Sequence, residues 1–286
     1  MIQKKRQQGV TLIELLVVAT IITLLTAVGL PAFRALNNAF ESGGSVERMI
    51  NSMLTTARSK AIQGQRYVGV RFQKRFRNDP LAASQYMILI ERDSVSTGIQ
   101  SGFKAVQGLK PVKLPDSVGV MDLNVADPGE RKPMSPETSP TQTLDEDPND
   151  SDELLNDLSE LRDVTTFSVI FSPQGHLVVH GVRVRNNSGK LDGDSSSPDD
   201  VFNTFEQVNM GNAQFLQDDY FEGSVSESAT DIRGLGPEAS RLSFVIFKTE
   251  PFINAYNQGQ AWTGYLHTLQ RRYGNRYTGA LTPAKP

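Results

Sequence analysis

The longest apolar stretch of the chain lies near its amino terminus. Residues 10–30 form a run of 21 residues whose only charged side chain is Glu14. As an α-helix, this run would be about 31 Å long, close to the hydrocarbon thickness of a bilayer. Lys4, Lys5 and Arg6 precede it, and the positive-inside rule keeps such residues in the cytoplasm and sends the rest of the chain outward. We therefore predict a membrane-spanning helix over residues 10–30.

A second apolar pattern begins after Gly43-Gly44 and has the spacing of a helix. Its members recur three and four positions apart and therefore share one helix face: Val46, Met49, Ile50, Met53, Leu54, Ala57 and Ala61. We predict one long, bent helix from Val10 to about Ile62, in which residues 31–63 carry the membrane segment onto a head. Adjacent glycines cost roughly 2 kcal/mol of helix propensity, so Gly43-Gly44 is a candidate hinge or break.

Residues 64–286 carry patterns that are typical of β-strands. These patterns occupy residues 67–73, 86–91, 166–171, 176–185 and 242–248, and a hairpin-like turn occupies residues 172–175. One long helix packed on a mostly antiparallel sheet makes an α+β fold. A further helix is expected after Pro251, and residues 261–273 are a candidate continuation of it.

Two stretches of the head are predicted to be disordered loops because they have few apolar residues to bury. Residues 126–153 hold five Pro and nine Asp or Glu. A short helix is expected to follow them, with Leu154, Leu155, Leu158 and Leu161 on one side. In the second stretch, residues 186–200, Asp192 and Asp194 offer the oxygen ligands that calcium takes. No complete calcium loop surrounds them, so a solvated acidic loop is the preferred interpretation.

The composition excludes several classes of function. The 29 Lys and Arg against 32 Asp and Glu give a net charge of −3, which provides no overall positive field for nucleic acid. The chain has no cysteine, which excludes disulfides, thiolate metal sites and a cysteine nucleophile. Neither a phosphate-binding glycine loop nor a serine nucleophile elbow is present. We expect a protein that is not an enzyme and that uses no cofactor.

The two histidines at positions 176 and 180 are a candidate metal pair. On a single strand, residues four positions apart point to one face, and two imidazoles on one face can share a metal ion. A third ligand is not identifiable in the sequence. Structural or exposed histidines are therefore the preferred interpretation of His176 and His180.

A basic and aromatic cluster lies near the carboxyl end. Arg271, Arg272 and Arg276 stand beside Tyr273 and Tyr277, and this combination suits phosphate contact and base stacking. The acidic net charge of the whole chain argues against nucleic acid as a partner. A solvated segment is the preferred interpretation, and DNA binding is the alternative.

The segment Gly9-Val10-Thr11-Leu12-Ile13-Glu14-Leu15-Leu16, together with Pro31, resembles the processing signal of type IV prepilins and type II secretion pseudopilins. In that family, a membrane aspartyl peptidase cuts after the glycine and methylates the new amino group. The resemblance implies that residues 1–9 are a cleaved leader, that Val10 becomes the N-methylated first residue, and that Glu14 and Pro31 serve filament assembly. Val10 departs from the more usual phenylalanine.

The chemistry of the cut explains why an acid lies in an apolar run. A carboxylate near the middle of a membrane helix costs about 2.5–3.5 kcal/mol. Cleavage after Gly9 exposes an α-amino group with a reference pKa near 8, which is mostly cationic at neutral pH. Opposite charges attract strongly in a medium of low dielectric. We hypothesise that Glu14 of an incoming subunit neutralises the amino terminus of its neighbour.

Three weaker features are similar to the H-type minor pseudopilins of type II secretion: residues 57–61, 112–115 and 171–175. The resemblance implies a minor structural subunit of a type IV pilus-like filament, most like the type II secretion pseudopilus. Implied partners are the prepilin peptidase, other pilins or pseudopilins, and an inner-membrane assembly platform. The implied location is the bacterial inner membrane, with a single span and a periplasmic or surface-exposed head.

Other interpretations of the same anchor stay open. A type IV minor pilin for adhesion or DNA uptake differs from a pseudopilin only in its head. An uncleaved single-pass membrane protein with an extracytoplasmic binding head would keep residues 1–9. A secretory signal peptide also begins with basic residues, but its apolar part is shorter, about 7–15 residues.

Overall fold

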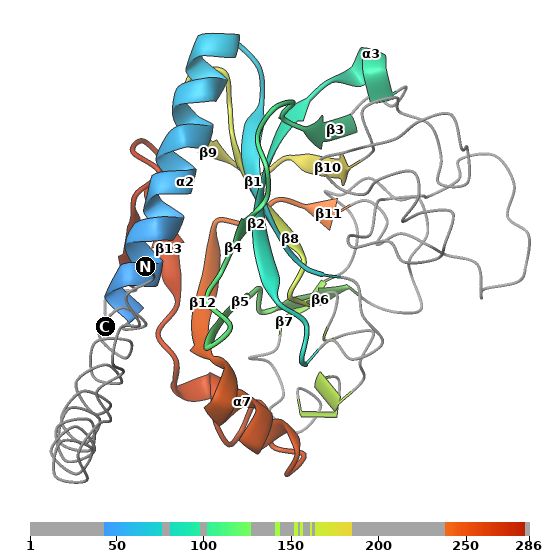
Figure 1. Ribbon diagram of the computed structural model, residues 1–286, viewed down its shortest axis with the longest axis vertical. Helices are drawn as coiled ribbons and strands as arrows, with labels where there is room; N and C mark the ends of the chain where they lie inside the picture. Colours follow the sequence, from blue (N-terminus) through green and yellow to red (C-terminus); the bar gives the residue numbers. More distant parts are fainter. Residues whose placement is uncertain are drawn as a thin grey trace, which may run out of the picture. The chain divides into compact units, whose positions relative to one another are not determined.

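The computed structural model describes residues 43–75, 81–97, 102–126, 141–143, 152–153, 155–156, 161, 164–184 and 238–283. The chain divides into two compact units, residues 1–45 and residues 46–286. Of the first unit only residues 43–45 are described. The described fold is therefore that of the second unit, which we call the head (Figure 1).

Helix α2 spans Gly43–Gly64 and buries the apolar face that the sequence predicts. Five residues of this face are at most 1% exposed: Val46, Ile50, Leu54, Ala57 and Ala61. The helix ends where Gln65 adopts a left-handed conformation with φ of 48°, and the N–H of Arg66 then bonds the carbonyl of Ala61 at 3.3 Å. The earlier part of the predicted helix, residues 10–42, lies outside the described residues.

The larger sheet has eight strands in the order β11-β10-β3-β2-β1-β8-β9, and β4 pairs with β2 beside this path. Its strands are β1 (Val68–Lys74), β2 (Gln85–Arg92), β3 (Gly102–Ala105), β4 (Val112–Lys113), β8 (Phe167–Phe171), β9 (Leu177–Val178), β10 (Gly181–Val184) and β11 (Glu238–Ala239). Strands β10 and β3 are parallel, and the other pairs are antiparallel.

A smaller sheet has four antiparallel strands in the order β14-β13-β12-β5. Its strands are β5 (Val118–Met121), β12 (Ser243–Lys248), β13 (Arg272–Gly274) and β14 (Leu281–Pro283). The short strands β6 (Asn124–Ala126) and β7 (Thr141–Thr143) form a separate hairpin. Further helices in the described part of the chain include α3 (Ser94–Thr97), α7 (Thr249–Tyr256) and the 3-10 helix η1 (Leu266–Thr268).

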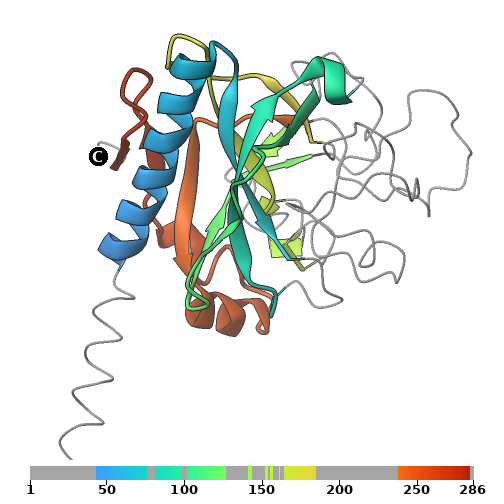
Figure 2. The same cartoon turned by 45° about the horizontal axis from the view of Figure 1, so that its top comes forward.

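The main core lies between α2 and the two sheets. Figures 1 and 2 show α2 on one side of the strands, with β12 beside it. Its apolar face packs against residues of β1, β2, β8, β5 and β12, among them Phe72, Phe167 and Phe244. A second cluster surrounds Trp262 and Phe252 next to α7. The described residues therefore have an α+β arrangement with mostly antiparallel strands.

The opposite face of the larger sheet is also buried, which a simple alternation of apolar and polar residues does not reveal. A third apolar cluster on that face includes Ile90, Phe103 and Ile170, each fully buried. Arg71 and Gln73 of β1 are 0% and 1% exposed, and the Nε of Arg71 donates to Oε1 of Gln73 at 3.0 Å. Nη1 of Arg71 also donates to the hydroxyl of Ser168 at 3.4 Å, so this buried guanidinium has partners on β1 and on the neighbouring strand β8.

The expected helix after Pro251 forms, but its expected continuation over residues 261–273 is wrong. Helix α7 ends at Tyr256, and turns, η1 and β13 follow it. Gly259 has a left-handed φ of 68°, which ends the helical path before residue 261, and Oδ1 of Asp152 accepts a hydrogen bond of 2.6 Å from the N–H of Trp262.

Within the stretch predicted as a loop, residues 126–153, the structure places strand β7 and the buried side chain of Asp152. Helical backbone follows at the described positions 152–153, 155–156, 161 and 164, and Leu155 and Leu161 are both fully buried. The predicted loop over residues 186–200, which contains Asp192 and Asp194, lies outside the described residues.

Candidate functional site

The sharp turn between β8 and β9 packs directly against the last turns of α2. The N–H of Gly175 bonds the carbonyl of Ser172 at 2.8 Å, and φ of Gly175 is 77°. The Nε of Arg58 donates to the carbonyl of Gly175 at 3.0 Å, and a Cβ at Gly175 would lie 2.6 Å from Cδ1 of Ile62. Two of the three weaker sequence features, residues 57–61 and 171–175, are therefore in contact.

The third weaker feature, residues 112–115, lies elsewhere and joins β4 to β2. The N–H of Leu114 bonds the carbonyl of Gln85 at 2.9 Å. The Nζ of Lys113 and the hydroxyl of Ser84 each lie 2.8 Å from the carboxylate of Asp116. The hydrogen bond from Lys113, supported by that from Ser84, lowers the pKa of Asp116 below its ordinary value.

Asp116 of this ion pair also lines a pocket of about 390 Å³. Its lining combines the polar Ser84 and Asp116 with the apolar Leu81, Phe247 and Ile253. The pocket is large enough for a small ligand. Asp116 pairs with Lys113, and Lys74 adds a further cation to the lining, so charges of both signs surround the pocket and do not define a ligand class.

The β13–β14 hairpin is tied along the flank of α2. Arg272 of β13 forms an ion pair of 3.5 Å with Glu47 of α2. The N–H of Leu281 in β14 donates to Oδ1 of Asn51 at 2.9 Å. The hairpin also contacts the larger sheet, because the N–H of Leu177 bonds the carbonyl of Arg276 at 2.8 Å.

The structure separates the three arginines of the predicted basic cluster. Arg272 is partly buried and paired with Glu47, Arg271 is half-buried, and Arg276 is exposed in the turn of the hairpin. Tyr273 and Tyr277 are 41% and 65% exposed. Only Arg276 and Tyr277 lie together at the β8–β9 turn, so the cluster does not form a continuous row of free cations.

The expectation that His176 and His180 share one strand face is wrong. His176 lies in the turn before β9, where its ring meets that of Tyr277 edge to face at 5.4 Å. His180 lies between β9 and β10, and its ring packs 4.3 Å from that of Tyr67. In the part of the chain that the structure describes, no three His, Asp or Glu residues lie close enough to hold a metal ion.

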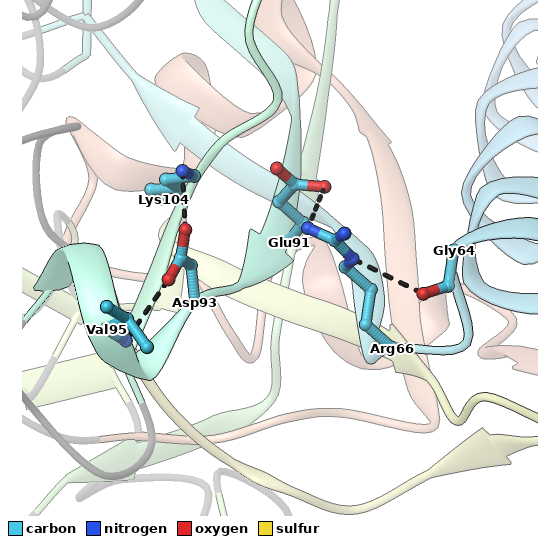
Figure 3. A network of polar contacts seen from close by, with 6 residues as sticks. All are labelled: Gly64, Arg66, Glu91, Asp93, Val95 and Lys104. Carbon is cyan, nitrogen blue, oxygen red and sulfur yellow. Dashed lines mark hydrogen bonds and ion pairs between the residues drawn. The ribbon is translucent and has the colours of Figure 1, made fainter.

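Charged residues fix the end of α2 to the larger sheet (Figure 3). Arg66 contacts the carbonyl of Gly64 at 3.5 Å and the carboxylate of Glu91 in β2 at 3.4 Å. Asp93 accepts a hydrogen bond of 3.1 Å from the N–H of Val95 and forms an ion pair of 2.6 Å with Lys104 of β3. These contacts position α3 at the end of the head where α2 terminates (Figure 1).

Two polar links carry no signal in the sequence, one between the two sheets and one between neighbouring strands of the smaller sheet. The side-chain amide of Gln85 bonds the N–H and the carbonyl of Val120 in β5, each at 2.7 Å, and the carbonyl of Thr165 at 2.8 Å. Asp122, which follows β5, pairs with Arg241, which precedes β12. To predict either link, one must know which strands are neighbours, and local sequence patterns do not contain this information.

The residues expected to direct processing and assembly, Gly9, Val10, Glu14 and Pro31, lie outside the described residues. Among the helices that the structure does describe, none has the length and apolar character needed to cross a membrane. Among the described residues, α2, the β8–β9 turn and the β13–β14 hairpin meet on one side of the head, and this side is the candidate site.

Comparison with known proteins identifies one family model, the prokaryotic N-terminal methylation motif, which matches residues 4–30. No curated protein and no solved structure matches the chain. The motif is of the prepilin type, and it implies a membrane-anchored chain that a prepilin peptidase processes and that assembles with other pilins. The matched segment therefore indicates a structural protein of the type IV pilin-like class.

Proposed function

We propose that this protein is a minor subunit of a type IV pilus-like filament, and specifically of a type II secretion pseudopilus. The observation that carries the proposal is the methylation motif at residues 4–30, followed by a helix whose apolar face packs on an α+β head. The contact between Arg58 and the β8–β9 turn supports the H-type assignment, because it links two of the sequence features that resemble that subgroup.

In the proposed mechanism, the peptidase cuts between Gly9 and Val10 and methylates the amino group of Val10. Before assembly, the subunit stays in the inner membrane with residues 10–30 in lipid and its head in the periplasm. During assembly, the helix leaves the lipid and packs against those of neighbouring subunits. Glu14 then pairs with the terminal ammonium of a neighbour, and Pro31 bends the helix between its membrane part and the head.

Processing is tested by mass analysis of the amino terminus of protein extracted from membranes that contain the prepilin peptidase. The expected product begins at Val10 and carries one methyl group, and Gly9→Leu should leave residues 1–9 attached. Recovery of the wild-type chain with its first nine residues would contradict the proposal and favour the uncleaved membrane protein.

Assembly is tested with Glu14→Ala, and Glu14→Asp serves as the matched variant that keeps the charge. We expect both variants to be cleaved, but only the aspartate variant to enter filaments purified from cells, because the alanine variant leaves the neighbouring ammonium unpaired. Incorporation of Glu14→Ala at the wild-type level would exclude the proposed role of Glu14.

The assignment to secretion is tested by deleting the gene and measuring both protein export and pilus-dependent functions. A pseudopilin deletion should stop the export of secreted proteins and leave surface pili, adhesion and DNA uptake intact. The opposite result would assign the subunit to a type IV pilus.

A further inference from the structure

Acidic residues are distributed very unevenly along this chain. The stretches 48–66, 164–184 and 251–283 contain eight Lys or Arg and no Asp or Glu. In contrast, 24 of the 32 acidic residues of the chain fall within residues 122–163 and 186–238. Charges of both signs are normally interspersed on a protein surface, so three acid-free stretches of this length indicate a local positive field.

The fold brings these three stretches together at one place on the head. Arg58 of α2 bonds the carbonyl of Gly175 in the β8–β9 turn at 3.0 Å. The next residue, His176, contacts the ring of Tyr277 in the β13–β14 hairpin at 5.4 Å. We call the surface formed by Arg58, Ile62, His176, Arg276 and Tyr277 the acid-free face.

Its side chains combine charge, aromatic area and aliphatic area. Tyr277 is 65% exposed and Ile62 is 38% exposed, and both belong to the few large apolar side chains that the described residues expose. Arg276 and His176 are also exposed. Tyr and Arg are enriched in protein interfaces because each offers a large contact area together with a polar end.

We propose that the acid-free face binds an acidic polypeptide segment of a partner protein. Carboxylates of the partner would pair with the guanidinium of Arg276, and apolar side chains between them would pack on Tyr277 and Ile62. Charge complementarity supports this pairing, since no carboxylate from the three stretches competes for Arg276. The proposal names a class of binding partner for the head and does not depend on processing at Gly9.

The arrangement favours a polypeptide over nucleic acid. A nucleic acid groove needs several free cations along the path of the phosphates. On this face the Nε of Arg58 is bonded to Gly175 and Arg272 is paired with Glu47, which leaves Arg276 as the exposed arginine of the hairpin. A single exposed guanidinium next to the exposed ring of Tyr277 in the sequence suits an isolated carboxylate with apolar neighbours better than a row of phosphates.

The test uses the full chain extracted in detergent and a short fluorescent peptide of alternating Glu and Tyr. Binding is followed by fluorescence anisotropy at increasing salt concentrations. Arg276→Glu should weaken binding about tenfold, and Tyr277→Ala should weaken it severalfold. Lys110→Glu is the matched control, because Lys110 is exposed, lies outside the three stretches and undergoes the same charge change. It should change binding less than about twofold.

Several results would overturn the proposal. If Arg276→Glu and Lys110→Glu weaken peptide binding equally, the peptide is attracted only by the net charge of the protein. Equal binding of a Gln-Tyr peptide would remove the role of the carboxylates. Stronger binding of single-stranded DNA, or of phosphatidylglycerol vesicles, with the same dependence on Arg276 would assign the face to a different partner. Each of these results leaves the proposed filament function untouched, because none of the assays requires cleavage or assembly.

Discussion

The N–H of Leu281 donates a hydrogen bond of 2.9 Å to the side-chain oxygen of Asn51, which joins the last described strand to helix α2. Leu281 is 8% exposed and belongs to the main core. The bond therefore fixes the β13–β14 hairpin at the point where its apolar side chain enters the interior. Together with the pair of Glu47 and Arg272, it makes the hairpin an integral part of the helix flank.

Replacing Asn51 by alanine should lower the free energy of unfolding by about 1 kcal/mol, because the N–H of Leu281 loses its acceptor. Asn51→Asp keeps an acceptor oxygen and should retain most of the stability. Thermal unfolding of the detergent-solubilised chain, followed by circular dichroism, measures both changes. Equal destabilisation by the two variants would show that the hydrogen bond is not the cause.

Gly175→Ala should be more destabilising than Gly108→Ala. Both glycines have positive φ, 77° and 79°, so both substitutions cost about 1–2 kcal/mol for a left-handed backbone. Only at Gly175 does the new Cβ meet a neighbour, Cδ1 of Ile62 at 2.6 Å, whereas Gly108 faces open space. Comparing the two melting temperatures isolates this clash.

The double variant Gly175→Ala with Ile62→Ala serves as the control for this prediction. It should recover stability relative to Gly175→Ala alone, since the shorter side chain removes the obstructing methyl group. If the stability effects of the two substitutions simply add, the cost of Gly175→Ala comes from its left-handed backbone and not from the clash with Ile62.

Gln85→Ala should cost about 3 kcal/mol of unfolding free energy. The substitution leaves the N–H of Val120 and the carbonyl of Thr165 without the amide that bonds them, and each unsatisfied buried group costs about 1–3 kcal/mol. Gln63→Ala on the exposed side of α2 is the matched control and should cost less than about 0.5 kcal/mol. Chemical denaturation measures both, and similar values would refute the bridging role of Gln85.

Asp116→Asn should remove a pH-dependent part of the stability. The pKa of Asp116 is lowered in the folded state, so its contribution is present above the unfolded pKa of about 3.9 and is lost as the pH falls through the folded value. The carboxylate is 69% exposed, which limits the effect to less than about 1 kcal/mol. The melting temperatures of wild type and variant should differ at pH 7 and converge in strong acid.

Local patterns in the sequence predict the elements of the head better than they predict its contacts. The spacing of Val46, Ile50 and Leu54 defines the buried face of α2, because a helix with one apolar stripe has a single way to pack. The turn at residues 172–175 can also be predicted, because Pro173 fixes its own φ and Gly175 tolerates the positive φ that the turn requires. The sequence does not predict strands β3 and β5, since each has only four residues and shows no clear alternation.

The candidate site depends on contacts between distant segments, and the sequence does not contain these in local form. The separation of His176 from His180 follows from the end of β9 at Val178, which no pattern marks. The pairing of Arg272 with Glu47 likewise depends on where β13 is placed beside α2. Only the methylation motif at residues 4–30 is recognisable without a fold, because its chemistry is read from contiguous residues.

The amide of Gln85 offers a way to observe when the two sheets separate. The N–H of Val120 belongs to the smaller sheet, but its acceptor is a side chain of the larger one. Its proton therefore exchanges with deuterated solvent only when the seam between the sheets opens. Exchange at this single position, compared with that of Val70 in the centre of β1, reports whether the head opens at the seam before it unfolds as a whole.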